Sequence, residues 1–161
     1  EEIKLTPKSD AAKLANNIAD ELELGNIKTI DDLRLYQSSL NDRYAIQNLS
    51  NQEYWENLAN QIYAGRGVIY IEEGKGLIMA IISPSVWCNK TYVMHELAWY
   101  VKPEFRHTTT GYRLLKAYID YAKELKEKNR IQAFTITKMV SSPDIKYEKF
   151  GFSKLEENWI Q

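Results

Sequence analysis

The residues RHTTTG between Arg106 and Gly111 have the composition of an anion-binding turn, because they are small or basic. The apolar spacing that follows predicts an amphipathic helix from Gly111 onward. The first turn of a helix carries backbone N–H groups without partners inside the helix, together with the positive end of the helix dipole. The sequence therefore predicts a seat for a phosphate group in this turn.

Two adjacent titratable residues, His95 and Glu96, lie inside the apolar run VMHELAWYV at residues 93–101. The run is rich in β-branched and aromatic residues and predicts a strand buried in the middle of a sheet. A charged group in such a strand costs free energy unless it is paired, which favours a functional role for at least one of the two. Neighbours on a strand face opposite sides of the sheet, and the pKa of histidine is near neutrality, so both are candidate proton acceptors.

The length and composition bound the class of protein. The 161 residues are enough for one domain, which we expect to span residues 1–161. With 44% hydrophobic and 27% charged residues and a net charge of −1, the chain is not expected to bind nucleic acid or an anionic membrane. One cysteine and two histidines argue against a disulfide or a structural zinc site. No apolar run approaches a membrane span and no targeting segment is visible, so we expect a cytoplasmic protein.

Turn residues and apolar periodicity predict the elements of the first half of the chain. They are an edge strand at 3–5, a helix at 11–24 closed by Gly25-Asn26, a helical region from Thr29 or Asp31 to about 46, and a helix at 51–63.

The second half alternates strands with helices. We expect strands at 67–71 and 77–82 joined by a turn at 72–76, a break at Ser83-Pro84, a loop at 87–90, the strand at 93–101, the long helix, a strand at 131–137, a helix capped by Ser142 that ends at Gly151, and a last strand from Phe152. The path from 93 to 137 is long enough for a parallel crossover. The fold class is therefore α/β with a mixed sheet, in the order β-α-α-β-β-β-α-β-α-β.

The run VKPEFRHTTTGYRLL at residues 101–115 resembles the pyrophosphate-binding motif of the GCN5-related N-acetyltransferase (GNAT) superfamily, V-x-P-x-[YF]-[RQ]-x-x-[GA]-x-[GA]-x-x-L-L. The matching positions are Val101, Pro103, Phe105, Arg106, Gly111, Leu114 and Leu115. Thr109 stands where the first Gly or Ala is usual, and its hydroxyl could donate a hydrogen bond to a phosphate oxygen. A second segment, YEKFGF at 147–152, resembles the superfamily's Y-x-x-x-G-F segment.

The resemblance implies a GNAT fold, with a mostly antiparallel sheet and a parallel pair at its central strands. It implies an acetyl-CoA-dependent N-acetyltransferase that transfers an acetyl group directly to a primary amine of a small molecule, a protein lysine or a protein N-terminus. A homodimer is compatible with this reading. The implied cofactor-binding residues are Trp99, Tyr100, Val101, Arg106, His107, Thr108, Thr109, Thr110, Gly111 and Tyr112.

The resemblance also implies catalytic roles. A backbone N–H near Trp99 to Val101 would polarise the thioester carbonyl, and Tyr147 would protonate the leaving thiolate. Relatives with a glutamate base carry it at about the position of His95, whereas Glu96 has the matching side chain but the opposite facing. Both residues remain candidate bases.

Two questions stay open in the sequence. The acceptor would be chosen in the region from about 28 to 64 and around Trp87, where the aromatic residues of interest are Tyr36, Tyr44, Trp55 and Trp87. The competing reading is a non-catalytic GNAT-fold module that has lost turnover and keeps coenzyme A binding.

Overall fold

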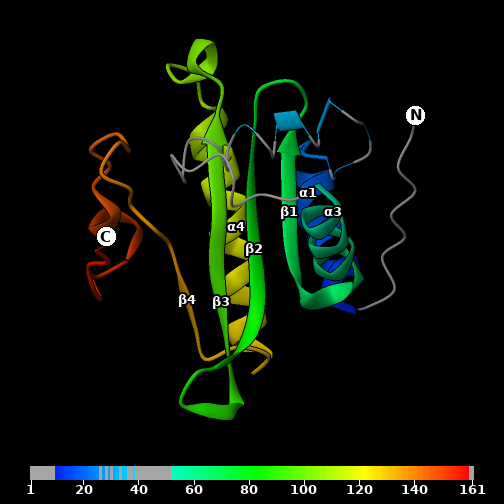
Figure 1. The fold of residues 1–161 in the computed structure, drawn as a ribbon, viewed down its shortest axis with the longest axis vertical. Coiled ribbons are helices and arrows are strands. Elements are labelled where there is room, and N and C mark those ends of the chain that lie inside the picture. The colour runs from blue at the N-terminus through cyan, green and yellow to red at the C-terminus, as the bar shows by residue number, and fades with distance from the viewer. Residues whose placement is uncertain are drawn as a thin grey trace.

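The computed structural model describes residues 10–25, 27, 29, 31–32, 34–35, 38 and 52–159. A four-stranded sheet in the order β1-β2-β3-β4 organises this part of the chain (Figure 1). The strands are β1 Gly67–Glu72, β2 Gly76–Ser85, β3 Cys88–Val101 and β4 Ala133–Thr135. The first three are antiparallel neighbours, and β3 pairs with β4 in parallel. The expected mixed sheet, mostly antiparallel with one parallel pair, is confirmed, and β4 is the edge strand of the described sheet.

Helices cover both faces of the sheet. They are α1 Asp10–Glu21, α3 Gln52–Gln61 followed by a π-helical turn Ile62–Arg66, and α4 Thr110–Glu127. Alternate residues of β1 belong to two different apolar clusters: Tyr70 packs with α1 and α4, whereas Ile69 packs with residues of α3 and the π-helical turn. Because successive side chains of a strand point to opposite faces, the two clusters lie on opposite sides of the sheet.

The long helix α4 lies behind β2 and β3 in Figure 1. Its buried residues include every member of the expected apolar stripe, which is Leu114, Leu115, Tyr118, Ala122 and Leu125. Full burial of a leucine side chain contributes about 1.5–3 kcal/mol, so this stripe fixes the helix firmly on the sheet. The turn before α4 is consequently held in a fixed place at the end of β3.

A β-bulge interrupts β3 in its second half. Met79 of β2 pairs with Ala98, but the next residue, Ala80, pairs with Glu96, so Leu97 is the extra residue. Before the bulge Met94 faces the α4 cluster, and after it Trp99 faces the same cluster, although five positions separate the two residues. The bulge therefore places Glu96 and Trp99 on the same face of the sheet.

The end of α1 differs from the expectation. The helix stops at Glu21, and Glu23 takes a positive φ of 55° while the Leu24 N–H donates to the Ala19 carbonyl at 2.7 Å. This is the usual geometry of a helix C-terminus, with Glu23 in the left-handed position that glycine commonly occupies. The expectation that Gly25 closes the helix is wrong, because Gly25 instead exchanges two backbone hydrogen bonds of 2.6 Å with Ile71.

The hairpin between β2 and β3 is longer than expected. β2 continues through Ser83-Pro84 to Ser85, and Pro84 lies opposite Tyr92. Pairing of β2 with β1 stops at Ile81, so proline sits where the outer edge of β2 needs no N–H donor. The expected break at 83–84 and the expected loop at 87–90 are therefore wrong, and β3 already begins at Cys88.

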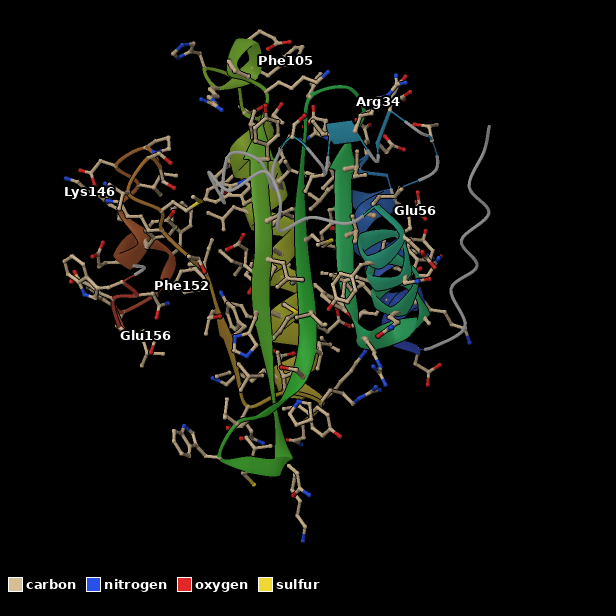
Figure 2. All side chains as sticks on the ribbon, in the orientation of Figure 1. Arg34, Glu56, Phe105, Lys146, Phe152 and Glu156 are labelled. Carbon is tan, nitrogen blue, oxygen red and sulfur yellow. The ribbon has the colours of Figure 1, made fainter. Side chains whose placement is uncertain are left out.

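The C-terminal elements also differ. The expected helix from Ser142 is only a 3-10 turn, Tyr147–Phe150, and the Ser142 hydroxyl accepts the Met139 N–H at 3.0 Å instead of capping a helix. Gly151 ends this turn with a φ of 86°, as expected. The strand expected from Phe152 is absent from the described residues up to 159. Phe152 lies on the side of the segment that faces the sheet (Figure 2), where its ring packs against Phe134 with centroids 5.5 Å apart.

Some expectations fall on residues outside the description. These are the strand at 3–5 and most of the helical region up to 46, including Tyr36 and Tyr44. The expected start of that helical region is confirmed. The Asp32 N–H donates to the Thr29 hydroxyl at 3.2 Å, and the Thr29 N–H donates to the Asp32 carboxylate at 3.0 Å. This reciprocal pair is a capping box. The side chain of Trp55 is likewise outside the description.

Candidate active site

The strands β3 and β4 pair at only three positions, from Val93↔Ala133 to His95↔Thr135. After β4 the chain diverges from β3. The distance between the two widens toward the end of β3 that leads into α4 (Figure 1). The expected strand at 131–137 is therefore shorter than the sequence suggests. The separation leaves the second half of β3 without a strand partner on this side, in the described part of the chain.

Glu96 lies where the two strands separate. Its side chain is 5% exposed, and its carboxylate accepts the backbone N–H of Thr137 at 3.0 Å. That N–H belongs to the backbone that would otherwise extend the parallel ladder, so Glu96 gives it a partner after the strand has ended. Tyr118 of α4 supports the same segment, because its hydroxyl donates to the carbonyl of Thr135. The diverging chain is thus held by two side chains from the core.

Tyr147 lies close enough to Glu96 for its ionisation to depend on it. Burial, and then the negative charge of Glu96, raise the pKa of Tyr147 above its usual value. The same two causes, in the same order, raise the pKa of Tyr118. Both phenols therefore stay protonated at neutral pH, which is the state that a proton donor requires.

His95 points to the other face of β3, as the strand alternation predicts. It is half-buried, and its Nδ1 atom lies 3.1 Å from the hydroxyl oxygen of Thr135. A titratable side chain therefore lies on each face of β3, next to the position where β4 ends. The geometry places Glu96, but not His95, on the same face as Trp99.

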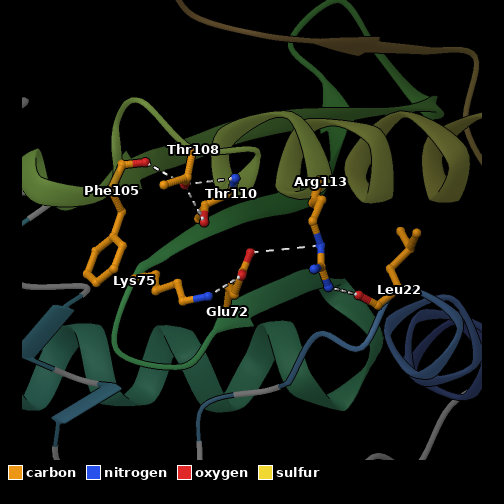
Figure 3. Close-up of polar contacts among 7 residues, drawn as sticks. All are labelled: Leu22, Glu72, Lys75, Phe105, Thr108, Thr110 and Arg113. Atoms are coloured by element: carbon orange, nitrogen blue, oxygen red, sulfur yellow. Dashed lines mark hydrogen bonds and ion pairs between the residues drawn. The ribbon is translucent and has the colours of Figure 1, made fainter.

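The anion-binding turn, residues 106–111, is held by its own threonines. The Thr108 hydroxyl donates to the Phe105 carbonyl at 2.7 Å and accepts the Thr110 N–H at 3.3 Å (Figure 3). The hydroxyl oxygen of Thr110, a buried residue, lies 3.1 Å from that of Thr108. Thr109 is exposed and makes no side-chain cap of the helix. Thr108 and Thr109 are both exposed, but only the hydroxyls of Thr108 and Thr110 take part in these contacts.

The start of α4 leaves backbone donors available. The first hydrogen bond within the helix runs from the Arg113 N–H to the Thr109 carbonyl at 2.9 Å. The N–H groups of Gly111 and Tyr112 precede it and so have no partner in the helix. A Cβ atom on Gly111 would meet only ordinary contacts, 3.7 Å from Val101 and 3.8 Å from Trp99. The packing of α4 therefore does not itself require a glycine here.

A second donor lies nearby. The indole N–H of Trp99 is buried and has no hydrogen-bond partner in the described part of the chain, an arrangement that costs free energy. The ring contacts the position of Gly111 through its Cζ2 atom, which places this N–H beside the start of α4. The unpartnered backbone N–H groups at this helix N-terminus suit a ligand with phosphate oxygens, as coenzyme A has. The residues present fit that group.

Two basic residues of the turn have different surroundings. The Arg106 Nε atom donates to the Val101 carbonyl at 3.0 Å, and its guanidinium lies 5.9 Å from the centre of the Tyr100 ring. Arg106 therefore ties the turn back to the end of β3. His107 is exposed. Among the described residues, no three His, Cys, Asp or Glu side chains gather into a possible metal site.

The fold and the site define a mixed α/β protein with an anion-ready helix start beside two separating parallel strands. The family model of the acetyltransferase (GNAT) family matches residues 32–152, and the chain belongs to that family. A search of the curated proteins finds no match.

Solved structures with the same fold are distant in sequence. A glucosamine-6-phosphate N-acetyltransferase from Arabidopsis thaliana is 18% identical, with a TM-score of 0.61 over 86% of this chain and 95% of that one. An acetyltransferase from Trypanosoma brucei is 18% identical, with a TM-score of 0.56 over 81% and 92%. A predicted acetyltransferase from Clostridium acetobutylicum, solved with acetyl-CoA, is 14% identical, with a TM-score of 0.53 over 100% and 92%. Likeness at this identity shows the fold alone.

The structure also separates residues that the sequence grouped together. Trp87 is 94% exposed at the tip of the hairpin, at the opposite end of β3 from the start of α4. The sequence reasoning missed the role of Tyr118, because its helical spacing indicates a core residue and gives no signal of its bond to Thr135.

No helix of the described chain is long and apolar enough to span a membrane.

The threonine contacts predict different costs for two neighbouring substitutions. Thr108→Val removes the acceptor of the Thr110 N–H and should lower the free energy of unfolding by about 1 kcal/mol. Thr109→Val removes the hydroxyl of an exposed residue that does not cap the helix, and should change that energy by less than about 0.5 kcal/mol. Urea denaturation followed by circular dichroism measures both. Equal losses in the two variants would show that the contact of the Thr108 hydroxyl with the Thr110 N–H adds no stability of its own.

Proposed function

We propose that this protein is an acetyl-CoA-dependent N-acetyltransferase that transfers an acetyl group directly to a primary amine. One observation carries the proposal: the free N–H groups of Gly111 and Tyr112 lie at the end of the sheet toward which β3 and β4 separate. An acidic and a phenolic side chain, Glu96 and Tyr147, lie at that separation. Membership of the acetyltransferase (GNAT) family supports this reading.

The proposed cofactor site follows from the contacts of the turn. The N–H groups of Gly111 and Tyr112 would hold the pyrophosphate, with the positive end of α4 behind them. Thr109 is exposed, and its hydroxyl would add a donor to a phosphate oxygen. The rest of the cofactor would lie along the second half of β3, from Val101 toward Glu96, where the described chain offers no strand partner.

The residues of this chain would perform three tasks in the reaction. Bound acetyl-CoA supplies the thioester whose acetyl group passes to the amine. Backbone N–H groups between Trp99 and Val101 would donate to the carbonyl oxygen, where negative charge develops. Tyr147 would give its proton to the departing sulfur, since its phenol is protonated at neutral pH.

The third task is to take a proton from the amine, since an ammonium group is not nucleophilic. We propose Glu96 first, because it lies on the same face of β3 as Trp99 and close to Tyr147. His95 is the competing base and lies on the other face. The acceptor would be an amine of a small molecule or of a protein, and the proposed location is the cytoplasm.

Calorimetry tests the cofactor. Titration of the protein with acetyl-CoA should give saturable binding, and incubation with a panel of amines should release free thiol, measured with a colorimetric thiol reagent. Typical KM values lie between about 1 μM and 1 mM. Absence of any binding at about millimolar acetyl-CoA would therefore exclude the proposed function. Binding without turnover on any amine would favour the alternative, a non-catalytic GNAT-fold module. The alternative is motivated by Thr109, which replaces a small residue of the family motif at the phosphate seat.

Tyr147→Phe separates these two readings. Removing the phenol from an enzyme should lower kcat by about 100-fold, the lower end of general acid–base effects, and leave the acetyl-CoA affinity within about twofold. The matched control is Tyr121→Phe, which removes a buried hydroxyl bonded to the Ala11 carbonyl. That control should lower the melting temperature without changing kcat. Equal kcat values in Tyr147→Phe and the wild type would rule out Tyr147 as the proton donor.

Isosteric variants identify the base. Glu96→Gln keeps a carbonyl oxygen for the Thr137 N–H, and His95→Gln keeps a polar partner for Thr135. A Glu96 base predicts a loss in kcat of about 100-fold in Glu96→Gln and a small change in His95→Gln. A His95 base predicts the reverse, a loss in kcat of about 100-fold in His95→Gln and a small change in Glu96→Gln.

A further inference from the structure

The segment that joins β3 to α4, residues 102–109, is held at both ends by one turn of the sheet. That turn, residues 72–76, joins β1 to β2 and is called here the β1–β2 turn. At the start of the segment, the Lys102 N–H donates to the Lys75 carbonyl at 2.8 Å. Just after its end, the Arg113 Nε atom lies 3.9 Å from the Glu72 carboxylate. The position of the anion-binding turn therefore depends on the β1–β2 turn.

Glu72 is the centre of these contacts (Figure 3). Its side chain is 11% exposed, and one carboxylate oxygen accepts the Lys75 ammonium at 2.9 Å. The other oxygen is buried and has no hydrogen bond, so its contact with Arg113 is an ion pair without a direct hydrogen bond. One nearly buried carboxylate thus serves two cations, and loss of either cation would leave its charge poorly compensated.

Arg113 extends the connection to a third element. Its guanidinium donates to the carbonyl of Leu22, just after the end of α1, where the helix dipole favours a cation. Lys75 makes a further contact, because its ammonium lies 5.9 Å from the centre of the Phe105 ring. The first turn of α4 is consequently tied to the end of α1 and to the edge of the sheet, while the helix body is fixed by its apolar stripe.

We infer that Glu72 and Arg113 are positioning residues for cofactor binding: they fix the direction of the N–H groups in the first turn of α4. This inference rests on the proposed function. Neither side chain needs to touch the ligand, since Arg113 is directed toward Glu72 and Leu22. Their loss should weaken acetyl-CoA binding and leave the chemical step unchanged, because Glu96 and Tyr147 are held by other contacts.

Glu72→Gln distinguishes positioning from simple electrostatics. Coenzyme A carries several negative charges, so removal of a nearby carboxylate would tighten its binding if only net charge mattered. Positioning predicts the opposite sign, because the neutral amide holds Arg113 and Lys75 less strongly. The sign of the change therefore decides between the two explanations.

The experiment compares Glu72→Gln, Arg113→Met and Arg113→Lys with the wild type. The control is Lys128→Met, which breaks an exposed pair with Glu124 at the far end of the same helix, with N and O atoms 3.0 Å apart. We expect the KM for acetyl-CoA to rise about tenfold in Glu72→Gln and Arg113→Met, with kcat within about twofold. Arg113→Lys should recover part of the loss, and Lys128→Met should match the wild type.

Amide hydrogen exchange of the protein without ligand gives an independent measurement. Exchange at the bonded amides of Thr108, Thr110 and Arg113 should be faster in Glu72→Gln and Arg113→Met, while the rest of α4 keeps its protection. An unchanged or lower KM in Glu72→Gln, or unchanged exchange in both variants, would overturn the inference. If the wild type binds no acetyl-CoA, the proposed function fails and hydrogen exchange alone decides whether the two residues position the turn.

Discussion

The hydrogen bond from the Thr137 N–H to the Glu96 carboxylate is the contact on which the candidate site depends. In a continuous parallel ladder, the backbone after Thr135 would bond to β3, and the two strands would remain about 4.8 Å apart. Here a side chain accepts the N–H of Thr137, so this backbone donor has a partner after the ladder has ended. The same contact keeps a carboxylate buried, which is costly without such a partner. A single bond therefore accounts for both the separation of the strands and the presence of an acid there.

The bulge at Leu97 determines which side chains lie together where the strands separate. With regular alternation, Glu96 and Trp99 would lie on opposite faces of the sheet. The extra residue reverses the alternation and brings both onto the face covered by α4. As a result, the acid at the strand end and the unpartnered indole N–H at the helix start lie along one side of the same strand. The candidate site thus follows the second half of β3. The turn before α4 lies at one end of the site, and Glu96 with Tyr147 nearby lies at the other.

The sequence predicted the elements that apolar patterns determine, and it failed where single polar contacts decide. The stripe of α4 and the buried strand are strong patterns, so their positions were predicted to within a few residues, apart from the start of β3. The helix expected after Ser142 rested on capping residues alone, without a continuous apolar stripe, and only the 3-10 turn formed. Pro84 looked like a strand break because a sequence does not show which strand edge lacks a partner. The bulge has no signal of its own in the run at 93–101.

The candidate site shows the same division. The motif at 101–115 predicted where the turn before α4 lies, because the contacts that shape this turn join neighbours within the motif, such as Thr108 with Phe105 and Arg106 with Val101. The contacts that orient the turn join residues far apart in the chain: Arg113 reaches Leu22 across 91 positions, and Glu96 reaches Thr137 across 41. The sequence shows Arg113 as a polar residue of a helix and Glu96 as a charged residue inside an apolar strand, and neither pattern identifies the distant partner. A phosphate seat at a helix start needs only free N–H groups, but its direction is set by what the first turn is tied to. In this protein the first turn of α4 is tied to the β1–β2 turn at the end of the sheet and to the end of α1.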